Sequence, residues 1–161
     1  HGAMDRAVIA TTINDVKKAL GALAWGGLVA DKMVFTQAEM DSAVGGLTAV
    51  GRFVAEGLIN SDQVEHVERR ERSHEFVHLS VQEWLAAAYL HQANELGNEA
   101  FIRQHVGNAR LGMVWRCGCS MMGAEASAPL IRAQVERRLF QGAIESSQAR
   151  QHDDNDIRNR K

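Results

Sequence analysis

The stretch 75-EFVHLSVQEWLAAAYL-90 changes its periodicity in the middle, and this change decides the fold. Residues 75–79 alternate in polarity, which is typical of a strand. Ser80 then begins S-V-Q-E, which predicts a capping box with Ser80 as N-cap and Glu83 reaching back to it. The following residues have helical spacing, and their predicted apolar face is Val81, Trp84, Leu85, Ala88 and Tyr89. The stretch therefore predicts a strand that runs directly into a helix, with His78 at the junction.

Two helices and a short strand are expected at the start of the chain, followed by a third helix. Thr36 begins T-Q-A-E, a second capping box with Glu39, and the helix that follows is expected to reach about Val44 and to end at Gly45-Gly46. The other elements are a helix at 12–30, a buried strand of Met33, Val34 and Phe35, and a helix with an apolar stripe of Leu47, Val50, Val54 and Leu58.

A β-hairpin is expected between the third helix and the stretch quoted above. Residues 59–62, "INSD", predict a turn, and "QVEHVER" (63–69) and "EFVHL" (75–79) predict the strands on either side of a polar tip, "RERSH" (70–74). The order helix, strand, helix, helix, strand, wing, strand is that of a winged-helix domain. We therefore predict a winged-helix domain at residues 5–79.

The rest of the chain predicts helices. A helical domain is expected at 80–146, and its last helix should hold Pro129 in the first turn and bury Ile131, Val135 and Leu139. Residues 147–161 are polar and aperiodic, so we expect a flexible tail, and residues 1–4, "HGAM", are typical of an expression scar. The expected fold class is mostly α: a winged-helix domain of three helices with a small β-hairpin, followed by an α-helical segment.

Composition excludes several classes of function. The chain has 161 residues, 45% of them hydrophobic, and a net charge of −2, which argues against nonspecific binding to nucleic acid. No apolar run approaches the ~18 residues of a membrane span, so no membrane partner is expected. The only cysteines, Cys117 and Cys119, do not suggest a disulfide framework. We expect them to be small core residues, as we expect of Trp84, Tyr89 and Trp115, in a reducing, cytoplasmic compartment.

The block "FVHLSVQEWLAAAYL" resembles the segment F-x-H-x-[ST]-x-Q-E-[FWY]-x-A-A of the NACHT-family signalling NTPases, the NOD-like receptors of innate immunity. "LGALAWGGLVADKMVFTQAEMD" is similar to the start of their winged-helix domain, and "ARLGMVWRCGCSMMG" is more loosely similar to a helix of their second helical domain. The resemblance covers roughly Ile13 to Gly123, and its specific part is Phe76 to Ala87. The sequence departs from the pattern at Val81, where the family more often has phenylalanine.

The resemblance implies a nucleotide-binding role for His78 in the full-length protein. In that family the matching histidine lies against the β-phosphate of ADP and helps to hold the resting receptor closed. An imidazole N–H can donate a hydrogen bond to a phosphate oxygen, so the role is physically sensible. The strand alternation suggests that Val77 and Leu79 face the core while His78 faces away from it. The alternative is a surface or interface histidine with a local hydrogen bond.

No P-loop motif, G-x-x-x-x-G-K-[ST], occurs in the chain, so it should not hydrolyse ATP and is not expected to be an enzyme by itself. By resemblance, the parent would bind ADP or ATP, its upstream NACHT nucleotide-binding domain would be the partner, and the parent would self-oligomerise during signal transduction. No cofactor is expected for this chain in isolation. A zinc site formed by His66, His74 and His78 has the wrong spacing, so no metal is expected.

Two other functions stay open on the sequence. One is a winged-helix protein-interaction scaffold with no nucleotide role, in which His78 is idle. The other is a winged helix that binds DNA. Its recognition helix would need to be basic, but "LTAVGRFVAEGL" carries only Arg52, and Glu56 offsets that charge.

Overall fold

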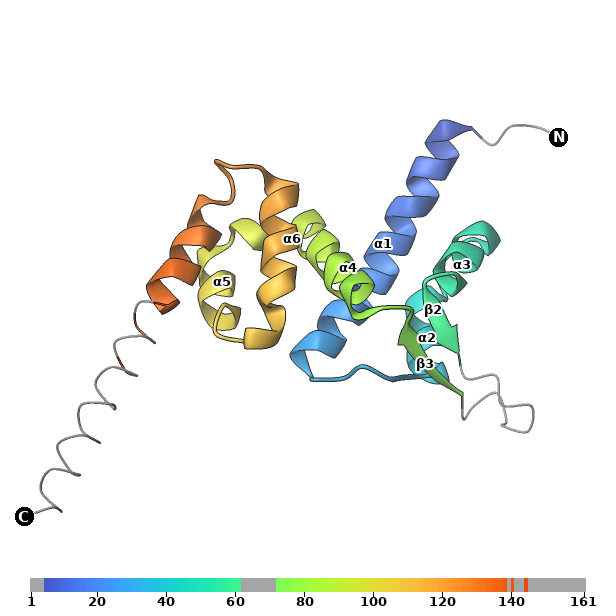
Figure 1. Cartoon of the computed structure of the whole chain (residues 1–161). Coiled ribbons are helices and arrows are strands. Elements are labelled where there is room, and N and C mark those ends of the chain that lie inside the picture. The colour runs from blue at the N-terminus through green and yellow to red at the C-terminus, as the bar shows by residue number, and fades with distance from the viewer. Residues whose placement is uncertain (1–4, 62–71, 139, 141–143, 145–161) are drawn as a thin grey trace, which may run out of the picture.

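The computed structural model describes residues 5–61, 72–138, 140 and 144, and the described chain is mostly helical with a small antiparallel sheet (Figure 1). A helix at 128–138 follows the last labelled element. The labelled elements are α1 (Arg6–Val29), β1 (Phe35–Thr36), α2 (Gln37–Val44), α3 (Ala49–Glu56), β2 (Ile59–Ser61), β3 (Ser73–Phe76), α4 (Leu79–Gln92), η2 (Glu95–Gly97), α5 (Glu99–His105), η3 (Ala109–Leu111) and α6 (Gly112–Met122).

Helices α1 and α4 pack closely because small residues line their contact. A Cβ at Gly21 of α1 would lie 2.6 Å from the Cβ of Tyr89 and 2.7 Å from the carbonyl oxygen of Leu85. On α4, Ala86 and Ala87 are fully buried. Without side chains in the way, the two backbones approach each other and the larger neighbours fill the remaining space.

Three short strands form a sheet in the order β1-β3-β2, with both pairs antiparallel. Phe35 of β1 lies opposite His74 of β3, and Ile59 of β2 lies opposite Phe76. The rings of Phe35 and Phe76 meet edge to face, with centroids 5.7 Å apart. Such a pair is a favourable aromatic geometry, and it joins the sheet to the core beneath it.

Within the described residues, one cluster of buried apolar side chains extends from Val16 to Leu130. It includes residues of the sheet, such as Phe35, and residues of the later helices, such as Leu111 and Trp115. Leu20, Leu90 and Leu111 are fully buried. The domain boundary that we place at Ser80 stays a prediction.

Several predicted features are confirmed. Thr36 is the N-cap of α2: its Oγ accepts from the backbone N–H of Glu39, while the Glu39 carboxylate accepts from the backbone N–H of Thr36. Helix α2 ends at Val44, with Gly45 as C-cap. Pro129 lies in the first turn of the helix at 128–138. Trp115 is a core residue, whereas Tyr89 is only partly buried.

The predicted burial of the first strand is mostly wrong. Only Phe35 is buried, while Met33 and Val34 are exposed. These two residues belong to the connection that precedes β1, where the backbone forms no strand ladder.

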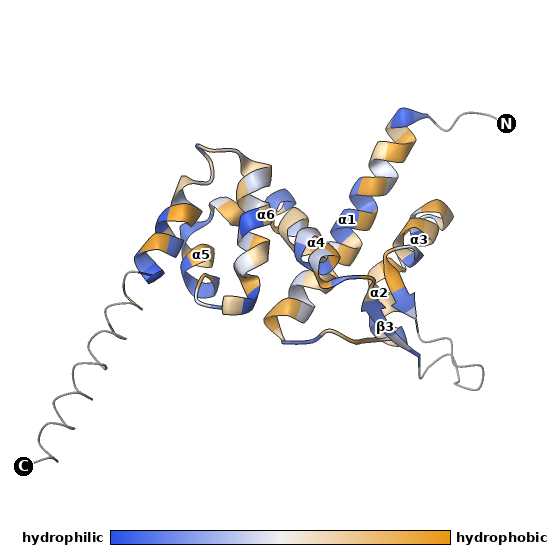
Figure 2. Cartoon of the chain, in the orientation of Figure 1, coloured by the Kyte–Doolittle hydropathy of each residue, from blue (hydrophilic) through white to orange (hydrophobic). Residues whose placement is uncertain are grey.

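The predicted apolar stripe of α3 is also wrong. Val50 and Val54 are exposed, Leu58 is only partly buried, and Leu47 is buried but precedes the helix. The buried face consists of Gly51 and Ala55. Figure 2 shows that apolar colour nonetheless runs along α3.

The hairpin differs in detail from the expectation. Residues Ile59–Ser61, predicted as a turn, form β2, and β3 covers Ser73–Phe76, so His74 belongs to a strand rather than to the wing tip. The predicted strand 63–69 lies outside the described residues.

The predicted buried face of the last helix is wrong for two of its three residues. Ile131 and Val135 are exposed, while the neighbouring Leu130 is buried. Leu139 and the predicted tail at 147–161 lie outside the described residues.

No helix within the described ranges is both long and apolar enough to cross a membrane.

Candidate functional site

His78 lies between the end of β3 and the start of α4, and it is exposed. It is the N-cap residue of α4, with extended backbone angles (φ −158°, ψ 146°). Its ring Nδ1 accepts a hydrogen bond from the backbone N–H of Ser80 at 3.1 Å, and the Ser80 hydroxyl oxygen lies 2.7 Å from the same atom. The imidazole therefore takes the place that a serine or aspartate side chain usually takes at a helix N-terminus.

These contacts determine the tautomer of the ring. Because Nδ1 accepts from an amide N–H, it carries a lone pair, and in the neutral ring the proton is on Nε2. Among the described residues, Nε2 has no hydrogen-bond partner. The arrangement thus leaves one N–H donor available at the positive end of the helix macrodipole, where an anion is favoured.

The predicted N-cap and capping box at this position are wrong. Helix α4 begins at Leu79, one residue before Ser80, and Ser80 contacts the ring of His78 instead of capping the helix. The prediction of which residues face the core is wrong as well: Val77 and Leu79 are exposed, whereas Phe76 is buried. His78 is exposed because the strand ends at Phe76 and the chain turns into the helix.

The next charged side chain along α4, Glu83, lies in a partly apolar setting. It lines a pocket with Leu28, Met33 and Met113. Burial raises the pKa of Glu83, and the charge of His78 partly opposes that rise. Burial also raises the pKa of Cys117, and the Glu83 charge adds to the effect. A thiol with a raised pKa is a poor nucleophile, so Cys117 fits a packing role.

Trp84 is 40% exposed, so its predicted place in the core is wrong. The ammonium group of Lys17 on α1 lies 5.2 Å from the centre of its ring, a cation–π contact between the two helices. Gln82, also on α4, is fully buried, and its Nε2 lies 3.4 Å from the carbonyl oxygen of Ala24 on α1. Gln82 Oε1 has no hydrogen-bond partner in the described part of the chain.

His74 is separate from His78 and is held inside the fold. Its Nδ1 lies 2.9 Å from the hydroxyl of Ser61, and its Nε2 lies 3.0 Å from Oε1 of Gln37. It is buried and joins β3 to β2 and to α2. Among the described residues, no group of His, Cys, Asp and Glu side chains could hold a metal ion. His66 lies outside the described residues.

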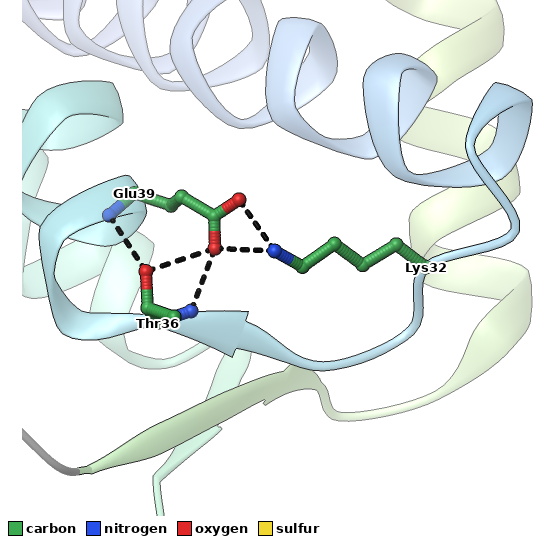
Figure 3. Close-up of polar contacts among 3 residues, drawn as sticks. All are labelled: Lys32, Thr36 and Glu39. Carbon is green, nitrogen blue, oxygen red and sulfur yellow. Dashed lines mark hydrogen bonds and ion pairs between the residues drawn. The ribbon is translucent and has the colours of Figure 1, made fainter.

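A polar cluster at the start of α2 positions the segment that precedes it (Figure 3). The Lys32 ammonium group donates to both carboxylate oxygens of Glu39, at 2.6 and 2.7 Å, and the Thr36 hydroxyl contacts the same carboxylate at 2.9 Å. The hydrogen bond from Lys32, followed by those from Thr36, lowers the pKa of Glu39 to about 2. The capping motif was visible in the sequence, whereas the contact with Lys32 depends on the turn after α1.

No protein-family model matches the chain, and no curated protein matches it.

Proposed function

We propose that this chain is the regulatory winged-helix and helical segment of a NACHT-type signalling NTPase, and that it acts as a lid and relay for ADP-dependent autoinhibition. The proposal begins from the motif between Phe76 and Ala87. It gains support from the order of the first elements, helix, strand, two helices and a β-hairpin, which is the order of a winged helix. The partner would be the nucleotide-binding domain of the same parent chain, in a cytoplasmic receptor that self-oligomerises.

The observation that carries the proposal is the state of the His78 ring. Its Nδ1 is held by Ser80, so the ring is oriented before any ligand arrives, and Nε2–H is left as a donor. A preorganised donor loses less side-chain entropy when it binds a phosphate oxygen. The proposed contact requires one such N–H at the start of α4, and no catalytic group on this chain.

Substitutions at His78 can separate ADP binding from helix capping. In the full-length protein, His78→Ala removes both the cap and the donor, whereas His78→Asp keeps a good N-cap but places a negative charge against a phosphate. We expect both variants to release ADP faster and to signal without stimulus. Only His78→Ala should also lose stability, by about 1 kcal/mol, the usual cost of a lost cap.

The measurements are ADP retention after gel filtration and thermal unfolding. His91→Ala is the matched control, because His91 is an exposed histidine in the last turn of the same helix. Normal ADP retention and a silent receptor in His78→Asp would rule out the phosphate contact.

A protein-interaction scaffold is the second candidate function, and one observation favours it over DNA binding. Phe53 of α3 is 76% exposed, beside exposed Val50 and Val54. A recognition helix for DNA would present basic side chains instead. If Phe53→Asp abolished the binding of a protein partner, and the His78 variants retained ADP and signalled as the wild type does, the scaffold would be favoured.

A further inference from the structure

A small basic pocket lies between η3, the start of α6 and the helix at 128–138, away from His78. Its volume is about 350 Å³, near the lower end of the roughly 300–1,000 Å³ that is usual for small-molecule sites. Its wall contains three arginines, Arg116, Arg137 and Arg138, and no acidic residue. The other lining residues are Val106, Asn108, Ala109, Gly112, Trp115 and Gln134.

The positive charge of this pocket is not balanced within the described residues. None of its three arginines forms an ion pair there; the arginines that do are Arg103 and Arg110. Arg137 donates from Nη1 to the backbone carbonyl oxygen of Val106 at 2.8 Å, which orients the guanidinium group without neutralising it. Its other N–H donors have no protein partner among those residues. Several like charges around one cavity repel each other, and an anion in the cavity relieves that repulsion.

The wall of the pocket also contains the ring of Trp115. Trp115 is 1% exposed, and its indole Nε1–H has no hydrogen-bond partner in the described part of the chain. This nitrogen has almost no accessible surface, so a ligand in the pocket would contact the ring of Trp115 rather than its N–H.

We infer that this pocket binds a small phosphorylated ligand through its phosphate groups. Guanidinium groups bind phosphate with paired, charge-assisted hydrogen bonds, and an arginine that is already oriented loses little entropy in doing so. The cavity has more room than a single ion requires, which favours a ligand with two or more phosphate groups. This inference does not depend on the nucleotide role of His78, since the two sites share no residue.

The test is calorimetric titration of inorganic pyrophosphate into the chain and into two double variants of equal charge. Arg116→Gln with Arg138→Gln removes two exposed pocket charges that form no ion pair with any residue that the structure describes. Arg103→Gln with Arg132→Gln is the control, because both residues line the neighbouring cavity instead, where Glu99 and Glu136 also lie. We expect the pocket variant to bind about tenfold more weakly or worse and the control to bind normally.

A second readout reports on the pocket directly. In an NMR spectrum, pyrophosphate should shift the indole N–H resonance of Trp115, assigned with Trp115→Phe, more than those of Trp25 and Trp84. Absence of binding, or equal weakening in both double variants, would overturn the inference. Weakening by His78→Asp alone would place the anion at α4, which would overturn this inference while supporting the proposed function.

Discussion

Helices α1 and α3 both carry large apolar side chains, yet only α1 buries some of them, namely Val16, Leu20 and Leu28. On α1, Leu20 is fully buried, and the neighbouring Gly21 brings α4 into close contact. On α3, the buried positions are Gly51 and Ala55, while Phe53 is 76% exposed. On α1 the large and the small residues share the packed face, whereas on α3 the small residues alone mark it.

The physical reason is the distance at which two helices can approach. A Cβ at Gly51 would lie 3.3 Å from the Cβ of Leu47 and 3.7 Å from Cγ2 of Thr12 on α1. Helix α3 therefore contacts α1 through its glycine at ordinary van der Waals distance, and this orientation turns Phe53 outward. The hydrophobic effect favours burial of any apolar area, but close packing selects which surfaces fit.

The largest expected effect follows from deleting a buried side chain on α1. Leu20→Ala should destabilise the fold by about 2–5 kcal/mol, because it removes transfer free energy and leaves a cavity. Phe53→Ala on α3 is the counterpart and should change stability by less than about 0.5 kcal/mol, since its side chain is mostly in water. Urea unfolding measures both values. If Phe53→Ala proved as costly as Leu20→Ala, the contrast between the two helices would be wrong.

A smaller effect is expected from adding one methyl group to the contact between α1 and α4. Gly21→Ala should destabilise by about 1–3 kcal/mol, because its Cβ would collide with the backbone of Leu85, which cannot move aside easily. Gly26→Ala on the same helix has open space around its Cβ, so it should stabilise by about 0.5–1 kcal/mol. Thermal unfolding of the two variants compares them. Equal effects of the same sign would show that the helices do not rely on close approach.

The smallest effect concerns the start of α2, where the ion pair between Lys32 and Glu39 adds to the packing of Met40. The pKa of Glu39 is lowered from 4.5 to about 2, so its ionised form stabilises the fold fully above pH 4.5, and this stabilisation is lost as the pH falls towards 2. Glu39→Gln should therefore be less stable than the wild type at pH 7, and the difference should shrink between pH 4.5 and 2. Urea unfolding at several pH values measures it. A difference that did not vary with pH would mean that the carboxylate charge is unimportant, and Asp41→Asn on the exposed side of α2 is a suitable control.

The positions of the helices were predicted better from the sequence than the faces that they bury. The capping motif at Thr36 located α2, because its signal is local and involves residues three positions apart. At Ser80 the same kind of motif misled, because the His78 ring took over the capping role. The sequence therefore located the strand-to-helix junction and its exposed histidine, but not the hydrogen bond that orients the ring.

The basic pocket could not be predicted, because its arginines come from two segments. Arg116 belongs to α6, while Arg137 and Arg138 belong to the helix at 128–138. In the sequence they are ordinary charges on helices with no common motif. Their convergence depends on how those helices pack, and such long-range placement is not contained in any local pattern.

By itself, the sequence determined the helical character of the chain, the order of its elements and the junction that contains His78. Periodicity, caps and glycine breaks are local, so they follow from residues within one or two turns. The tertiary structure alone decided that α1 and α4 pack through Gly21, that α3 exposes Phe53, and that three arginines surround one pocket. These features depend on which surfaces fit together, and that fit involves atoms far apart along the chain.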